Sequence, residues 1–205
     1  SGFHALVEQA LDTVDTANTW EVTHARVNRE NNILRYTLPK YGNHKQLAER
    51  SQGHMLAMCG VAIASGFSIN STEVYNLRRF FHHFLIAKQL NDDAHDWQED
   101  LHAGHISSVV SLLLKQKAPS KCDLDTDIPM LRIHFWESTV HEVSELILAH
   151  LKYARHHLSK SGMKNPQLLE TLLMPLEKAA RAAASQQTQA KKFIAAYSKT
   201  NANAF

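Results

Sequence analysis

The chain has 205 residues and a formal net charge of +2, with 44% hydrophobic and 20% charged residues. This composition is typical of globular proteins, and the scattered, nearly balanced charges exclude the strongly basic surface expected of a nucleic-acid binder. Seven Gly and five Pro are roughly half the usual share of these residues. Their scarcity disfavours a β-sandwich or barrel, which needs frequent turns, and predicts an all-α protein.

The predicted elements are mostly long helices joined by short links, with apolar residues recurring at three-to-four spacing. Ser71 or Asn70 can cap the third helix, and Pro175 is expected to kink the last one. We expect a single helical domain of about six helices, a bundle, with a frayed tail at 201–205. The predicted helices span residues 3–35, 44–66, 71–103, 106–117, 130–159 and 166–199.

Two further observations concern the cellular location. Cys59 and Cys122 are too few for a disulfide framework, and the sequence shows no signal-peptide pattern, which together predict a cytoplasmic protein. The longest nearly apolar run, residues 55–67, is shorter than the roughly 20 residues that cross a bilayer, so no membrane span is expected.

The segment QLNDDAHDWQED, residues 89–100, is the most unusual part of the chain. It carries five carboxylates and no Lys or Arg. On a helix, Asp92/Asp96 and Asp96/Asp100 are i,i+4 neighbours, and such like-charge pairs cost about 0.2–0.5 kcal/mol each. A bound divalent cation can offset this repulsion, and Mg²⁺ is the natural candidate because it prefers oxygen ligands.

The helical face that leads into this segment is apolar. At 100° per residue, the face that carries Phe81 and Phe84 continues into Asn91, Asp92 and His95. This arrangement predicts an apolar pocket that opens onto a metal site. The alternative is that a second apolar stripe (residues 87, 90, 94, 97 and 101) forms the core face and the acids are simply solvated.

Residues 88–96 resemble the second aspartate-rich motif of trans-polyprenyl diphosphate synthases, in which a Gln precedes D-D-x-x-D by three residues. Read from Gln89 through residues 96–100 to Gly104, the same segment is similar to the second acidic motif of squalene and phytoene synthases. Asn91, His95 and Glu99 form a degenerate version of the terpene-cyclase metal triad. All three families share the class I isoprenoid synthase fold, and the resemblance covers roughly residues 45–115.

The resemblance implies an isoprenoid-biosynthetic prenyltransferase that uses Mg²⁺ to bind and ionise an isoprenyl diphosphate. It also implies a role for each matching residue. The metal ligands would be Asp92 and Asp96, with Asp93 and Asp100 ligating or supporting them. The diphosphate contacts would be Lys88, Arg50 and Arg78, and the substrate pocket would include Gln89, Phe81 and Phe84.

One part of the family pattern is missing. No D-D-x-x-D precedes Asp92, and Asp12 and Asp15 are the nearest approach to it. The chain is therefore expected to be the C-terminal part of a longer synthase, inactive by itself, or to receive the first acidic motif from a second copy or a partner subunit.

Two other functions fit parts of the sequence. Glu21-x-x-His24 and Asp92-x-x-His95 have the spacing of carboxylate-bridged di-metal bundles, which residues 137, 141 and 145 could complete. This reading predicts oxidase chemistry with iron or manganese. The other alternative is a regulatory subunit of a prenyl synthase, without chemistry of its own.

Overall fold

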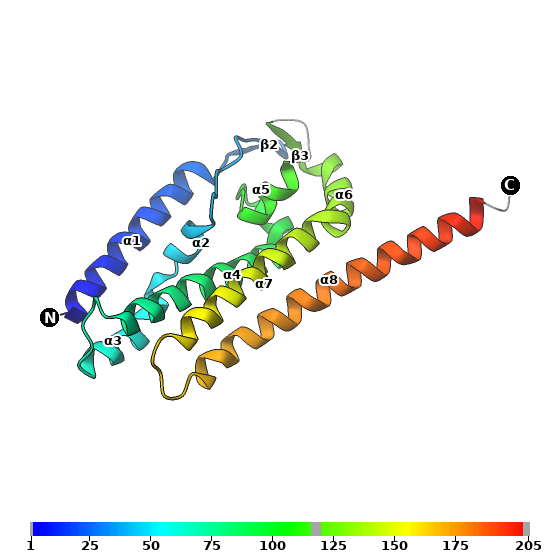
Figure 1. Cartoon of the computed structure of the whole chain (residues 1–205). Helices are drawn as coiled ribbons and strands as arrows, with labels where there is room; N and C mark the ends of the chain where they lie inside the picture. Colours follow the sequence, from blue (N-terminus) through cyan, green and yellow to red (C-terminus); the bar gives the residue numbers. More distant parts are fainter. Residues whose placement is uncertain (1, 116–119, 203–205) are drawn as a thin grey trace.

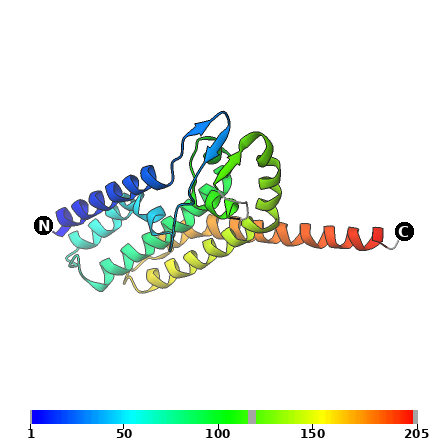
Figure 2. The same cartoon turned by 90° about the horizontal axis from the view of Figure 1, so that it is seen from above.

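The computed structural model describes residues 2–115 and 120–202, with side chains up to residue 189. The described chain is mostly helical, as predicted. Its long helices are α1 (Gly2–His24), α4 (Thr72–His102), α7 (Val140–Ser159) and α8 (Gln167–Ala202). Figure 1 shows α7 beside α4, and α8 running back along α7. In both views α8 then extends beyond the rest of the molecule (Figures 1 and 2).

Helix α4 forms the centre of the core. Ser71 caps it by accepting a hydrogen bond from the Val74 amide at 3.3 Å, and no Gly or Pro interrupts the helix. Its side chains Phe80 and Leu90 are fully buried and belong to one continuous hydrophobic core. The second apolar stripe identified in the sequence is therefore a core face, although Ala94 is only partly buried.

The first predicted helix is wrong beyond residue 24. Helix α1 ends at His24, and β1 (Arg29–Glu30) and β2 (Ile33–Arg35) follow as a hairpin. Asn31 and Asn32 form its turn with φ values of 47° and 61°, the left-handed conformation that two-residue hairpin turns require. Strand β2 also pairs with β3 (Lys121–Asp123), so contacts distant in sequence stabilise this small sheet.

The predicted helix over residues 44–66 is divided. The structure has α2 (Lys45–Glu49), the 3₁₀ turn η1 (Gln52–Met55) and α3 (Leu56–Ala64). The predicted helix at 106–117 is α5 (Ser108–Leu114), and its predicted end lies outside the described residues.

The last part of the chain is more helical than predicted. Asp123 accepts a hydrogen bond from the Asp125 amide and caps α6 (Leu124–His134), where a loop was expected. Helix α6 continues through a π-helical turn, η2 (Phe135–Thr139), into α7. Helix α8 passes through Pro175 as one element. No helix in the described ranges is long and apolar enough to cross a membrane.

Replacement of Gly104 should be costly for two reasons. It has a φ of +69°, and an added Cβ would overlap the Val27 carbonyl oxygen, where residues 25–27 pair with residues 104–106. We expect Gly104→Ala to lower the free energy of unfolding by at least about 2 kcal/mol.

Gly42→Ala is the matched control for this prediction. Gly42 has a φ of +56° but has no atom within 4 Å of an added Cβ, so only the backbone term of about 1 kcal/mol applies. Urea denaturation of both variants measures the difference. Equal losses would show that the close approach to Val27 is unimportant.

Candidate functional site

The acidic segment of α4, residues 89–100, is called the acidic turn below. Its carboxylates lie in different surroundings. The side chain of Asp92 is 40% exposed, and the Nζ atom of Lys88 lies 2.6 Å from its Oδ2. Asp96, one turn further, is exposed and makes no hydrogen bond or ion pair with any described residue. Asp92 and Asp96 therefore form an accessible pair of carboxylates on the outer side of α4.

Asp93 faces the interior instead. Its side chain accepts hydrogen bonds from Gln89 Nε2 at 2.8 Å and from the Ser108 amide at 3.2 Å, at the start of α5. Burial raises the pKa of Asp93 to about 6, although these two hydrogen bonds act in the opposite direction. The carboxylate holds α5 against α4, and this position does not support the prediction that Asp93 is a metal ligand.

Asp100 belongs to a network between α4 and α1. Its Oδ1 lies 3.0 Å from His105 Nδ1, and His105 Nε2 lies 3.7 Å from Glu21 Oε1. Glu21 is buried and forms ion pairs with Arg26, at 3.0 Å, and with Arg50. Asp100 and Arg50, predicted to bind metal and diphosphate, thus already have partners inside the protein.

The structure does not place all of the predicted basic residues beside Asp92. Arg78 lies fourteen positions before Asp92 on the same helix, so the two are separated by about 21 Å along its axis. Lys88 is the one residue of the predicted diphosphate contacts, Lys88, Arg50 and Arg78, that touches the Asp92/Asp96 pair.

The predicted pocket residues also have other roles. Phe81 is buried and packs edge-on against Phe80, and Phe84 stacks on Phe80, with ring centroids 5.1 and 6.1 Å apart. Gln89 binds Asp93. Phe81 is part of the hydrophobic core and Phe84 packs against it.

A different pocket lies next to the acidic turn. It has a volume of about 460 Å³ and lies between α4, α6, η2, α7 and α8. Its polar lining includes Asn91 and His95 of α4, together with a hydrogen-bonded pair in which Arg132 Nη2 donates to Gln98 Oε1 at 2.9 Å. The polar face of α4 therefore borders an apolar pocket, but Phe81 and Phe84, the residues from which the sequence predicted such a pocket, do not line it.

The residues that form the walls of this pocket were not predicted from the sequence to line a pocket. Trp97, Phe135 and Trp136 provide aromatic surface, and small side chains of α8 such as Ala180 and Ala183 leave the space open. The alanine-rich run at residues 179–184 is the sequence signal that could have identified this wall. Element η2 is a π-helical turn, a geometry that is frequent at functional sites.

The residues of the di-metal alternative do not converge. Glu21 is paired with arginines, and the His24 ring stacks on Trp20, with centroids 5.4 Å apart. Within residues 2–115 and the part that resumes at 120, no group of three or more His, Cys, Asp or Glu side chains is placed to hold a metal ion.

Comparison with known proteins gives no assignment for this arrangement. The chain matches no protein-family model, and no curated protein or solved structure is significantly similar to it.

Proposed function

We propose that this protein binds an isoprenyl diphosphate with Mg²⁺, as part of prenyl transfer in isoprenoid biosynthesis. The observation that supports the proposal is that two turns of α4 carry accessible carboxylates and also border an apolar pocket. Asp92 and Asp96 present carboxylates on the outer side, while Asn91 and His95 line the neighbouring apolar pocket. A volume of about 460 Å³ lies in the range of small-molecule sites.

The accessible donors suit Mg²⁺. This ion commonly binds one or two carboxylates together with substrate phosphates and keeps several waters. Asp92 and Asp96 would hold it, and Mg²⁺ would neutralise the charge of the departing diphosphate. Lys88 already lies on Asp92, so its ammonium group is within reach of a diphosphate at the same place.

The pocket supplies what the hydrocarbon part requires. The rings of Trp97, Phe135 and Trp136 give the pocket an aromatic wall, and aromatic faces stabilise a nearby cation. Arg132 lies in the pocket lining, where its guanidinium can bind a diphosphate oxygen. The proposal concerns binding by this chain; turnover also requires the first acidic motif, from a preceding segment or from a partner subunit.

Removal of both accessible carboxylates tests the metal part. We expect Mg²⁺ with pyrophosphate to raise the Tm of the wild type more than either alone, because a ligand at about 100 times its Kd adds about 2.7 kcal/mol. This shift of several degrees should disappear in Asp92→Asn/Asp96→Asn. The control Glu8→Gln/Asp12→Asn changes an exposed i,i+4 acid pair on α1 and should keep the shift. Loss in both variants would contradict the assigned site.

A second variant tests the pocket. Ala183 lines it and is partly buried, so Ala183→Phe should fill the space for a hydrocarbon chain. We expect the Kd for a non-hydrolysable isoprenyl diphosphate analogue to rise at least about tenfold, since each buried CH₂ contributes about 0.8 kcal/mol. Binding of pyrophosphate should not change. If Ala183→Phe weakened the binding of the analogue and of pyrophosphate equally, the hydrocarbon part of the ligand would not occupy this pocket.

A further inference from the structure

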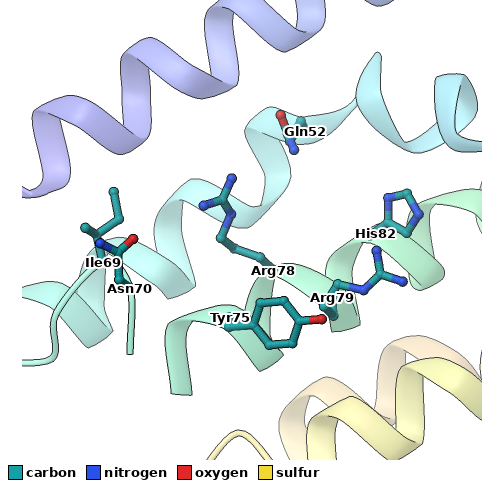
Figure 3. A pocket seen from close by; sticks show the side chains of 7 residues that line it. All are labelled: Gln52, Ile69, Asn70, Tyr75, Arg78, Arg79 and His82. Carbon is teal, nitrogen blue, oxygen red and sulfur yellow. The ribbon is translucent and has the colours of Figure 1, made fainter. Parts of the chain in front are cut away.

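A second cavity lies at the other end of α4. It has a volume of about 420 Å³ and lies between η1, the loop before α4 and the first turns of α4 (Figure 3). Arg78 extends from α4 toward the side of the cavity where Gln52 lies. The Arg79 guanidinium lies near the ring of His82 (Figure 3). Tyr75 and Asn70 complete the polar lining.

The charge of this cavity is positive. No carboxylate is among the residues that line it. Arg78 has no hydrogen bond or ion pair with the described part of the chain, and Arg79 contacts His83, with 3.1 Å between Nη2 and Nε2. Burial, followed by the neighbouring Arg79, His157 and Lys45, lowers the pKa of His82 to about 4.

The hydrogen-bonding groups also suit an anion. Guanidinium groups present forked N–H donors that match phosphate oxygens, and Asn70 and Tyr75 add further donors. The Oε1 atom of Gln52 is buried and has no hydrogen-bond partner among the described residues. Because the two ends of an amide can exchange by rotation, this side chain can turn its NH₂ group toward an oxygen-rich ligand.

We infer that this cavity binds the phosphate group of a small anion, through Arg78 and Arg79, with Gln52 and Tyr75 as further donors. Arg78 is about 21 Å along α4 from Asp92, so this site is separate from the acidic turn and requires no metal ion. It does not depend on the proposed binding of an isoprenyl diphosphate.

Calorimetric titration with inorganic phosphate, in EDTA and at constant ionic strength, tests the inference. We expect millimolar or tighter binding that Arg78→Gln weakens at least about tenfold, a loss consistent with one charge-assisted contact. Arg78→Lys keeps the positive charge but lacks the paired N–H donors of a guanidinium group, so its Kd for phosphate should lie between those of the wild type and Arg78→Gln. Arg35→Gln, which removes an exposed arginine on β2, should bind phosphate like the wild type.

The same titration distinguishes the source of the phosphate. Tighter binding of a phosphomonoester such as glycerol phosphate would assign the cavity to a phosphorylated small molecule, whereas equal affinity would assign it to free phosphate. No binding by the folded wild type would overturn the inference, as would equal losses in Arg78→Gln and Arg35→Gln. Loss of EDTA-insensitive binding in Asp92→Asn/Asp96→Asn would place the anion at the acidic turn and also contradict it.

Discussion

Acidification from about pH 7 to about pH 5 is expected to destabilise this protein by several kcal/mol, because a group of histidines that are buried or partly buried must remain neutral in the fold. The histidine cluster comprises His44, His82, His83, His150 and His157, on α4, α7 and the segment before α2. Their rings contact one another, with His83 and His150 joined by Nδ1 atoms 3.0 Å apart.

The hydrogen bonds define the neutral form of His83. Arg79 can only donate, so His83 Nε2 accepts its N–H at 3.1 Å. The proton of neutral His83 therefore lies on Nδ1, which donates to His150 Nδ1. A second proton on His83 would break the contact with Arg79 and place two cations together.

The pKa values follow from this environment. Burial, followed by Arg79 and the neighbouring histidines, lowers the pKa of His83 to about 3. Burial also lowers the pKa values of His82 and His150 to about 4. In the unfolded chain these groups titrate near 6.5. Below that pH the unfolded state therefore binds more protons than the folded state, and the free energy of unfolding decreases as the pH is lowered. Asp93, whose pKa is raised, acts in the opposite direction between about pH 6 and pH 4, but it is one group against several.

Urea denaturation at about pH 7.5, 6.5 and 5.5 measures how steeply the free energy of unfolding changes with pH. Each such histidine contributes up to about 1.4 kcal/mol per pH unit. His83→Gln should therefore reduce the slope by about 1 kcal/mol per pH unit. His102→Gln, at the exposed end of α4, should leave it unchanged. A slope that is the same in all three proteins would contradict the assignment to the cluster.

The second large effect is expected from Glu21. Its carboxylate is buried and forms ion pairs with both Arg26 and Arg50, and it also lies near His105. Removing one partner of a buried ion pair costs about 3–5 kcal/mol, because the remaining charge loses its counterion. Since both arginines are partly exposed, we expect Glu21→Ala to cost about 3 kcal/mol, the lower end of that range.

Two comparisons identify the cause of this loss. Glu8→Ala removes an exposed glutamate of the same helix and should change the free energy of unfolding by less than about 0.5 kcal/mol. In Glu21→Ala/Arg50→Met one of the two arginine charges that lost their counterion is removed as well, so part of the stability should return. If Glu21→Ala unfolds at the same urea concentration as Glu8→Ala, the network is not a major source of stability.

The central helix was predicted almost to the residue, because its signals are local. A serine cap, an acidic first turn and the absence of Gly and Pro up to Gly104 define α4 without reference to the rest of the chain. The hairpin that follows α1 was missed because its strands are short and β2 depends on pairing with residues 121–123. The Asn31-Asn32 turn was the one local signal for it.

The acidic segment illustrates the same division. Its composition and helical spacing predicted that residues 89–100 form a charged part of a helix beside an apolar face, and that Asp92 and Asp96 are neighbours on it. Only the tertiary structure showed that Asp93 accepts a hydrogen bond from the Ser108 amide and that Asp100 pairs with His105. It also showed that α7 and α8 form walls of the neighbouring pocket. Periodicity records which residues share a face of one helix, whereas the partner of each face depends on contacts between segments far apart in the sequence.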